Sequence, residues 1–353
     1  MKPKIIIARP IFEEVLTHLR QHFDVTDNQA DHMWTPAAWA QALSQHDGAL
    51  TTGADVRRLG VEGEGLDGVL YLRGMADAQG LKHRWDAATN VVVIGGGFIG
   101  LEVAAVARKN GKTTTVVHRN TRLLSRVVAP ETSEFFKQAH ERRGTTIRLN
   151  TNFSRFIGEN GKVTGVELEG GEVIPADLVM VGVGVIPRSD LAEKLGLELA
   201  NGSIVVDAQA RTSDPRVLAA GDAVTMPHPL THEGQIVLES VQNAVDQAKV
   251  AAKTIMGEET VYTAVPWFWS DQDTMKLQMA GLNIGYDQTV VRGNPDEEKF
   301  SVLYYKNGRV IAIDSVNEVL DYMAVRKALG AGQSMPADKV ADTSVKLKDL
   351  VEE

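Results

Sequence analysis

Short apolar runs alternate with amphipathic stretches over the first fifty residues. The pattern predicts strands at 4–8, 23–26 and 48–52, with helices at 11–22 and 36–44 between them. Pro10 suits the start of the first helix, because the first turn of a helix does not use its own N–H groups. Strands and helices that alternate in this way predict a parallel sheet. We therefore expect residues 1–53 to form a flavodoxin-like βαβαβ segment.

A second α/β unit follows an irregular, Gly-rich stretch. Its predicted strands and helices alternate again, and they lie at 91–94, 98–110, 113–117, 131–143 and 146–150. Three short antiparallel strands are expected next, because Asn160-Gly161 and Gly170-Gly171 are residues of tight hairpin turns. A buried strand at 178–183 completes the unit. Beyond it, strands at 204–206 and 217–220 and a helix at 240–255 precede a C-terminal α+β pattern that begins near Pro266.

The strongest motif is a glycine turn that joins an apolar strand to an amphipathic helix. Gly95, Gly97 and Gly100 have the Gly-x-Gly-x-x-Gly spacing, and Phe98 and Ile99 open the helix. The first glycine permits a tight turn, the second lets the backbone approach a pyrophosphate, and the third lets the helix pack on the strand. The helix N-terminus adds free N–H groups and a positive dipole end. In this context the motif predicts nucleotide binding rather than a flexible glycine loop.

The second strand of this unit ends in an unusual way. An acidic residue normally stands there and holds the ribose 2′-hydroxyl of NAD. This chain has His118 and Arg119 at that place, with Arg126 downstream. A carboxylate would repel a 2′-phosphate, whereas histidine and arginine would attract one. The sequence leaves two interpretations open: acceptance of NADPH, or a strand end that is simply solvated.

Composition narrows the possible functions. Among 353 residues there are 37 Lys and Arg and 46 Asp and Glu, giving a formal net charge of −9, which disfavours nucleic acid and anionic lipid as partners. Cysteine is absent, so a disulfide relay, a thiolate metal site and a chain-held iron–sulfur cluster are excluded, and we expect no metal site. The most apolar stretch, 178–187, is too short to span a bilayer, and the N-terminus lacks the apolar region of a signal peptide. We expect a cytoplasmic protein.

Five ordered motifs resemble one known family, the NADH-dependent ferredoxin reductases of oxygenase systems (the putidaredoxin reductase type). They begin after about residue 51 and are GGGFIGLEV (95–103), GVGVIP (182–187), RTSDPRVLAAGDAV (211–224), LESVQNAVDQAKV (238–250) and VPWFWSDQ (265–272). The resemblance implies an α/β fold with a Rossmann-type NAD-binding domain inside a glutathione-reductase-like architecture. It also implies that electrons pass from NAD(P)H through FAD to a [2Fe–2S] ferredoxin.

The resemblance further implies roles for individual residues. On the nicotinamide side, the pyrophosphate would lie on the glycine turn, the adenosine half near His118, Arg119 and Arg126, and the nicotinamide ring near Gly182 and Glu102, the candidate catalytic residue. On the flavin side, the implied FAD contacts are Thr52, Gly53, Arg57, Gly221, Asp222, Gln242 and Trp269. Asp222 would hold the ribityl–phosphate region, and Gln242 and Trp269 the isoalloxazine. The segment around Gly53 is one residue short, and Val56 stands where the family has proline.

The N-terminal segment departs from that family. Its members open with a second strand–Gly-x-Gly-x-x-Gly–helix that holds the FAD pyrophosphate, whereas the turn here is Arg9-Pro10-Ile11-Phe12. Bulky side chains there would block a dinucleotide, so we expect an incomplete FAD domain. Two stretches, MKPKIIIARP (1–10) and DGALTTG (47–53), instead resemble the N-terminus of a D-2-hydroxyacid dehydrogenase of the glyoxylate reductase kind.

Three functions follow from these observations. The first is an FAD- and NAD(P)H-dependent ferredoxin reductase, whose activity the missing FAD motif could impair. The others are a nicotinamide-nucleotide-binding protein that has lost FAD and activity, and a D-2-hydroxyacid dehydrogenase, whose catalytic residues have no match here. The predicted division of the chain is 1–53 (βαβαβ segment), 54–88 (connector and FAD-domain remnant), 89–186 (NAD(P)-binding domain), 187–262 (second half of the FAD domain) and 263–353 (C-terminal interface domain).

Overall fold

The computed structural model describes residues 2, 4–7, 13–28, 30, 35, 38, 41–42, 45–46, 48–50 and 53–352. Its N-terminal unit is a parallel sheet in which β1 (Lys4–Ile7) lies between β2 (Asp24–Thr26) and β3 (Gly48–Leu50). Helix α1 (Glu13–His22) carries acidic residues in its first turn and basic residues in its last, which suits the helix dipole. The predicted helix at 36–44 falls largely outside the described residues. None of the described helices has the length and apolarity to cross a membrane.

The central unit is built on a five-stranded parallel sheet. Its strands, in spatial order, are β5 (Val69–Tyr71), β12 (Leu178–Val181), β6 (Asn90–Ile94), β7 (Thr113–Val117) and β8 (Thr146–Arg148). Helices α4 (Phe98–Lys109) and α5 (Pro130–Arg142) form the crossovers, and α3 (Met75–Trp85) follows β5. An antiparallel sheet of β9 (Phe153–Glu159), β10 (Lys162–Leu168) and β11 (Val173–Pro175) connects β8 to β12. Chain order along the parallel sheet reverses beside β6.

Two short strands join this unit to the next one. β4 (Ala54–Val56), where the chain enters, pairs antiparallel with β13 (Val185–Pro187), where it leaves. The following unit holds α6 (Asp190–Lys194), α7 (Val241–Ile255) and a sheet of β14 (Leu199–Ala200), β15 (Ser203–Val205), β16 (Val224–Pro227) and β17 (Gln235–Ile236). The strand expected at 217–220 is reduced to a single bridge between Leu218 and Arg211.

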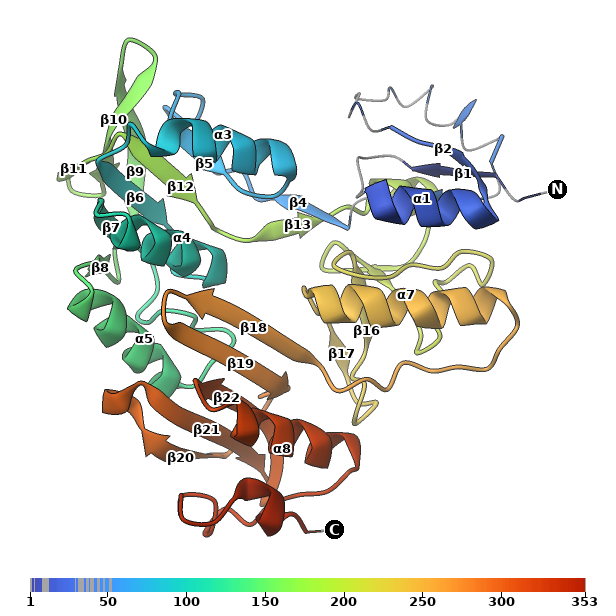
Figure 1. Ribbon diagram of the computed structural model, residues 1–353. Coiled ribbons are helices and arrows are strands. Elements are labelled where there is room, and N and C mark those ends of the chain that lie inside the picture. The colour runs from blue at the N-terminus through green and yellow to red at the C-terminus, as the bar shows by residue number, and fades with distance from the viewer. Residues whose placement is uncertain are drawn as a thin grey trace.

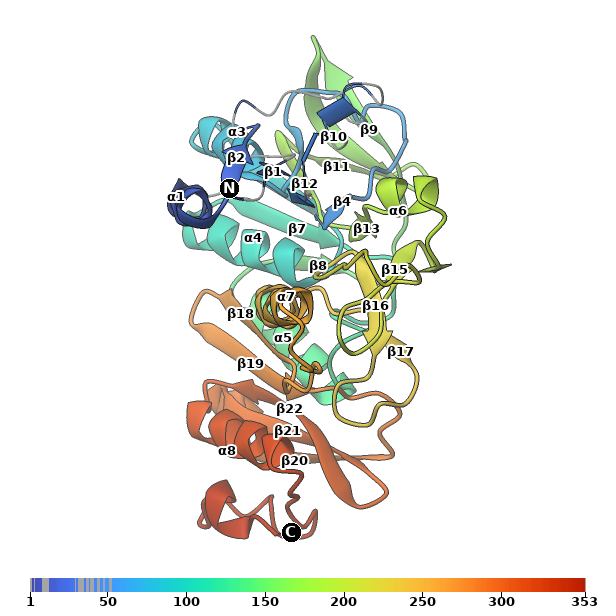
Figure 2. The ribbon, with the colours of Figure 1, turned by 90° about the vertical axis from the view of Figure 1, so that its right-hand side faces the viewer.

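The C-terminal domain is an antiparallel sheet with helices on one face. Its strands, in spatial order, are β18 (Trp267–Gln272), β19 (Met275–Gly281), β22 (Arg309–Val316), β21 (Lys299–Lys306) and β20 (Gln288–Asn294). Helix α8 (Val319–Gly330) packs on this sheet, and the short 3-10 helices η1 (Pro295–Glu297) and η2 (Leu347–Leu350) complete the domain. The N-terminal unit and the C-terminal domain lie at opposite ends of the molecule (Figures 1 and 2).

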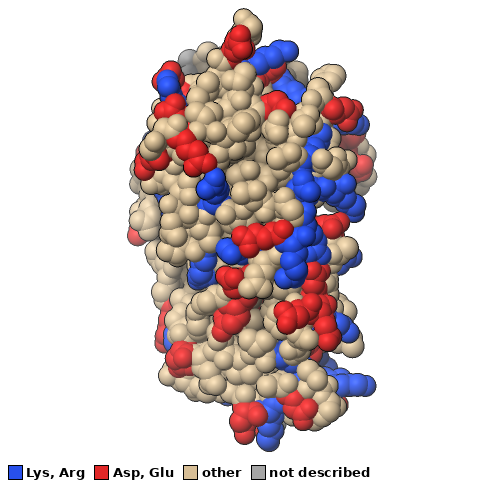
Figure 3. Space-filling view, turned by 90° about the vertical axis from the view of Figure 1, so that its left-hand side faces the viewer, with Lys and Arg blue, Asp and Glu red and all other residues tan. Residues whose placement is uncertain are grey.

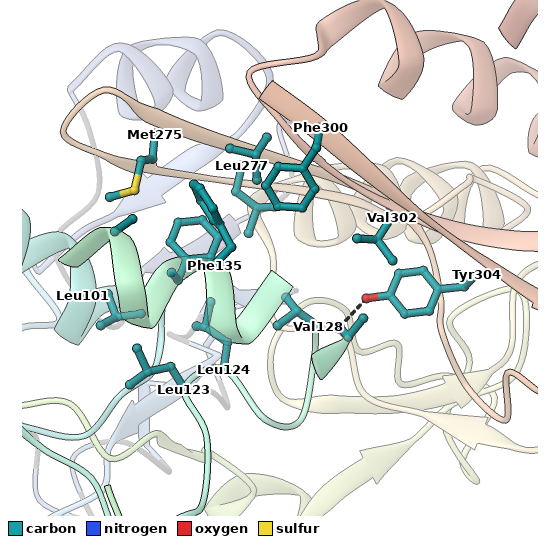
Figure 4. Close-up of a cluster of buried hydrophobic side chains, with 14 of the residues drawn as sticks. Leu101, Leu123, Leu124, Val128, Phe135, Met275, Leu277, Phe300, Val302 and Tyr304 are labelled. Carbon is teal, nitrogen blue, oxygen red and sulfur yellow. Dashed lines mark hydrogen bonds between the residues drawn. The ribbon is translucent and has the colours of Figure 1, made fainter. Parts of the chain in front are cut away.

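A shared hydrophobic core holds the C-terminal domain against the central unit. Phe135 from α5 contacts the ring of Phe300 edge-on, at 4.9 Å between ring centroids, and Leu277 and Tyr304 belong to the same buried cluster (Figure 4). Leu101 brings α4 into this cluster. Burial of such large side chains contributes about 1.5–3 kcal/mol each, so the two parts are firmly joined. The core thereby fixes β18 against α4, where the candidate site lies.

Candidate functional site

The glycine turn lies at the point where the strand order reverses. Gly95 directly follows β6, and Gly182 directly follows β12, its neighbour in the sheet. Gly95 has φ +112°, and a Cβ atom built on it would lie 2.2 Å from the carbonyl oxygen of Gly182, so only glycine fits there. In open α/β sheets, ligands bind in the crevice at the carboxyl ends of the strands on either side of such a reversal.

The other two glycines leave room for a phosphate and bring the helix close to the strand. A Cβ atom on Gly97, the N-cap of α4, would meet no atom within 4 Å, so the space above the turn is open. A Cβ atom on Gly100 would lie 2.3 Å from the carbonyl oxygen of Gly95. Phe98 is half-buried and Ile99 is exposed at the start of α4. The turn therefore fits a dinucleotide pyrophosphate.

His118, directly after β7, contacts the glycine turn. The backbone N–H of Gly96 donates a hydrogen bond of 3.0 Å to Nδ1 of His118. Nε2 therefore carries the proton of the neutral ring, and this atom is buried. Burial lowers the pKa of His118, the backbone of Arg122 raises it, and the positive charges of Arg119 and Arg126 lower it further. The ring is neutral at pH 7 and brings no negative charge to the strand end.

Glu102, on α4, stands at the end of a directed chain of hydrogen bonds. Ser270 donates through Oγ to Oε1 of Glu102 at 2.6 Å, and Gln272 donates through Nε2 to Oγ of Ser270 at 3.2 Å. His140 in turn lies 2.8 Å from Oε1 of Gln272 and donates through Nε2, since that oxygen can only accept.

This series of hydrogen bonds polarises the carboxylate of Glu102 and does not conduct protons to it. Every donor points toward the carboxylate, and an amide such as Gln272 does not readily pass a proton on. Burial raises the pKa of Glu102, Ser270 lowers it and the charge of Asp271 raises it. The sequence predicted a role for Glu102 but gave no sign of its connection to Ser270, Gln272 and His140, because residues so far apart in the chain leave no signal in local spacing.

Three of the predicted residues lie on strand β18 or contact it. Oε1 of Gln242, on α7, accepts a hydrogen bond of 3.2 Å from the backbone N–H of Trp267, three residues before Ser270. Trp269 lies between these two positions and is 42% exposed, so one face of its ring is available. Phe268 packs on Phe98 at 4.7 Å between ring centroids. Glu102 thus contacts the face of β18 that carries Phe268 and Ser270, Trp269 lies on the other face, and Gln242 contacts the backbone of the strand.

The predicted flavin-side residues meet at a second place. A Cβ atom on Gly53 would lie 3.3 Å from the backbone N of Asp222, and Gly221 before it has φ +85°. Arg73, which sequence reasoning missed, donates to the carboxylate of Asp222 at 3.3 Å and to the backbone oxygen of Ala54 at 3.0 Å. Arg57 is exposed and contacts the oxygen of Val185 at 3.3 Å. Thr52 lies outside the described residues.

These flavin-side contacts fit only part of FAD. The close backbone approach at Gly53 and the left-handed backbone conformation of Gly221 suit a ligand's ribityl–phosphate region. The exposed Trp269 on β18 suits an aromatic ring. No glycine precedes Gly48 in the chain, so the first strand is followed by no glycine turn for the pyrophosphate. The residues of that turn, 8–12, lie outside the described part.

The surface and side-chain chemistry limit other functions. Basic and acidic side chains are interspersed on the face in Figure 3, and such a mixed face does not resemble a nucleic-acid-binding surface. Within the described ranges, no group of three or more His, Asp and Glu residues is placed to hold a metal ion.

Comparison with known proteins identifies the family. The model of the family "Pyridine nucleotide-disulphide oxidoreductase" matches residues 20–248, and "Reductase C-terminal" matches 267–351. The ferredoxin–NAD(P)+ reductase of Sphingomonas sp. is 42% identical over 92% of this chain and 79% of its own length.

Two solved structures agree with this result. A ferredoxin reductase from Rhodopseudomonas palustris is 33% identical with a TM-score of 0.85, over 99% of both chains. A covalent putidaredoxin reductase–putidaredoxin complex gives 30% identity and a TM-score of 0.85, over 99% of this chain and 98% of the other.

These results confirm the resemblance and the fold class predicted from the motifs. The family match also begins at residue 20, earlier than the motifs indicated. The likeness of residues 1–53 to a D-2-hydroxyacid dehydrogenase stays a prediction. The chain belongs to the pyridine nucleotide-disulphide oxidoreductase family, and its relatives within that family include ferredoxin reductases.

Proposed function

We propose that this chain is an NAD(P)H-dependent ferredoxin reductase that passes electrons through FAD to a [2Fe–2S] ferredoxin. The observation that carries the proposal is the open glycine turn at the strand-order reversal, with Glu102 one helical turn beyond it. The family match and the relatives' activities support it. When bound, FAD would accept a hydride from the nicotinamide and release its electrons singly to the ferredoxin.

We propose the following roles for the chain's own residues. Gly95, Gly97 and Gly100 bind the nicotinamide nucleotide's pyrophosphate, with the N–H groups of Phe98 and Ile99 as donors. Gly182 leaves room for the nicotinamide, and Glu102, held by Ser270, orients it as the candidate catalytic residue. On the flavin side, Gly53 and Asp222 lie at the ribityl–phosphate region, and Gln242 and Trp269 at the isoalloxazine.

The domain limits and the location belong to the same proposal. The five-stranded sheet and its glycine turn support a nucleotide domain over 89–186, to which β5 from the stretch 54–88 adds an edge strand. The antiparallel sheet that begins at Trp267 supports an interface domain over 263–353. We propose a cytoplasmic location because the reductant is a cytoplasmic metabolite.

Anaerobic reduction of the FAD-loaded full chain tests the function. We expect NAD(P)H to bleach the visible flavin band, and a [2Fe–2S] ferredoxin then to become reduced. A matched protein with Gly97→Val should show neither signal. Failure of NADH and NADPH alike to reduce bound flavin would contradict the proposal.

The same experiment separates the other candidate functions. A nucleotide-binding protein without flavin would bind NAD(P)H and remain colourless after incubation with FAD. A D-2-hydroxyacid dehydrogenase would oxidise NADH with glyoxylate in the absence of flavin. The family match favours neither alternative.

A further inference from the structure

Two arginines near the end of β7 lack the partners that the other arginines of the nucleotide unit have. Arg119 and Arg126 are exposed, and neither forms a hydrogen bond or ion pair with any residue that the structure describes. The remaining arginines between 89 and 186 each have a backbone or carboxylate partner, and they are Arg108, Arg122, Arg142, Arg143, Arg148 and Arg155. The charges of both guanidinium groups act on His118, at the strand end where the nucleotide's ribose is expected, and the charge of Arg126 also acts on Glu239.

The residue between this pair and the glycine turn is uncharged. Nδ1 of His118 accepts a hydrogen bond from the backbone N–H of Gly96. The ring therefore provides an acceptor at this position without the negative charge of a carboxylate. Its Nε2–H group is buried beside the backbone of Arg122, so the ring contributes the absence of a carboxylate charge and not a donor to the phosphate.

We propose that the ribose end of the nucleotide site recognises a 2′-phosphate, so that NADPH is the preferred reductant of this chain. Arg119 and Arg126 supply the positive charge, and His118 removes the negative charge that would repel the phosphate. Guanidinium groups suit this role because their planar N–H groups match phosphate oxygens. The inference rests on the proposed function, and it adds the identity of the reductant.

Binding of two small probes to the full chain tests this inference without any catalytic step. Adenosine 2′,5′-bisphosphate and 5′-AMP differ only in the 2′-phosphate, and calorimetry gives a dissociation constant for each. We expect the bisphosphate to bind at least about tenfold more tightly, as one or more charge-assisted hydrogen bonds would provide. The ratio should fall as salt rises, because the guanidinium groups are exposed.

Matched variants show which residues carry the preference. His118→Glu and His118→Gln have nearly equal size and differ in charge, so only the glutamate variant should reverse the ratio in favour of 5′-AMP. Arg119→Gln and Arg126→Gln should each reduce it. Arg155→Gln, which removes an arginine already paired with Glu167 and Glu62, should leave it unchanged.

The outcomes separate this inference from the proposed function. Equal or tighter binding of 5′-AMP by the wild-type chain would overturn the NADPH preference and leave the nucleotide site intact. An unchanged ratio in folded His118→Glu protein would show that this position does not face the 2′-phosphate. If neither probe nor either dinucleotide binds, both the site and the preference are wrong.

Discussion

Two parts of this molecule are built in different ways: the nicotinamide half, residues 89–186, and the flavin half, residues 1–88 and 187–262. On the nicotinamide half, a turn of six residues, Gly95 to Gly100, carries the phosphate site on one strand and one helix. On the flavin half, the candidate contacts come from widely separated segments around Gly53, Asp222, Gln242 and Trp269. The phosphate site therefore depends on residues close together in the chain, whereas the flavin site forms only if all of these separate segments are present and folded together.

The two halves also differ in how much of each belongs to a buried hydrophobic core. The central sheet, its helices and the C-terminal sheet contribute to large buried clusters. Ile6, Ile7 and Leu16 of the N-terminal unit are buried, yet none of the described residues before Gly53 belongs to any of the five core clusters. The rest of the flavin half has its own buried cluster, which includes Val206, Val224 and Tyr262. We therefore expect the N-terminal unit to be the part of the flavin half that limits the activity of this chain.

The largest expected effect is on FAD affinity. The chain retains contacts for the flavin end, but it has no glycine before Gly48 to let backbone N–H groups surround the pyrophosphate. Losing several charge-assisted hydrogen bonds of about 1.5–3 kcal/mol each weakens binding by several orders of magnitude. Purified protein should be substantially flavin-free, and equilibrium dialysis should show FAD bound much more weakly than the nicotinamide nucleotide.

The flavin content of the purified protein is also the measurement that could most clearly contradict an incomplete flavin site. Stoichiometric FAD that survives extensive dialysis would mean that the N-terminal unit has rebuilt the pyrophosphate site. The two halves would then be equally complete, and flavin loading would no longer limit the reductase reaction.

The next effect concerns Gly97 on the nicotinamide half. A Cβ atom there would meet no protein atom within 4 Å, so we expect Gly97→Val to fold normally while its methyl groups occupy the pyrophosphate position. We expect affinity for NAD(P)H to fall at least a thousandfold, about 4 kcal/mol, by calorimetry. Gly100→Val is the contrasting variant, since its Cβ would lie 2.3 Å from the Gly95 oxygen and should lower the melting temperature as well. Retained affinity in folded Gly97→Val would place the nucleotide elsewhere.

Local features of the sequence predicted the nicotinamide half well. The helix expected at 98–110 is observed at Phe98–Lys109, and the hairpin turns at Asn160-Gly161 and Gly170-Gly171 connect the antiparallel strands as expected. These features depend on residues close together in the chain. The strand expected at 217–220 does not form, because a short apolar run becomes a strand only where a partner strand lies beside it.

Contacts between distant segments could not be predicted. The Phe135–Phe300 contact and the hydrogen bonds of His140 with Gln272 and of Ser270 with Glu102 each connect residues more than a hundred positions apart. Periodicity indicates that such side chains are buried, but not which ones meet. The family resemblance supplied the proximity of Gly53 and Asp222 and gave no information on Arg73, Ser270 or Gln272.

A third prediction concerns the core that joins the nicotinamide half to the C-terminal domain. Asp314 is fully buried and accepts a hydrogen bond from Tyr304, and burial raises its pKa to about 7 from an ordinary value of 3.8. A raised pKa means that the stability associated with the protonated form is complete below pH 4 and is lost as the pH rises through 7. Asp314→Asn keeps an acceptor for Tyr304 and cannot ionise.

Urea unfolding between pH 4 and pH 8 measures this effect. Wild-type protein should lose on the order of 3 kcal/mol of unfolding free energy across that range relative to Asp314→Asn. The two proteins should agree most closely at pH 4. Parallel curves for the two proteins would show that Asp314 is already ionised in the fold, and that the interdomain core tolerates its charge.

The smallest expected effect tests the contact between Glu102 and β18. Ser270→Ala removes the hydroxyl that donates to Glu102 and leaves Gln272 without its acceptor, which should cost about 1–2 kcal/mol of unfolding free energy. Since Ser270 lowers the pKa of Glu102, its removal raises a pKa that burial has already raised. Stability associated with the protonated carboxyl is complete below its ordinary value of 4.5 and is lost as the pH rises, so the variant should suffer more at pH 7 than at pH 4.

A double-mutant cycle isolates this contact from other effects of the substitution. Glu102→Gln removes the charge, so Ser270→Ala should cost less in that background, with a coupling energy of about 1 kcal/mol at pH 7 and less at pH 4. Calorimetry with NAD(P)H on the same four proteins tells whether the contact also positions the nucleotide. A coupling near zero at both pH values would mean that Ser270 contributes only packing, and that the nicotinamide half is joined to β18 by the Phe98–Phe268 contact and its surrounding core instead.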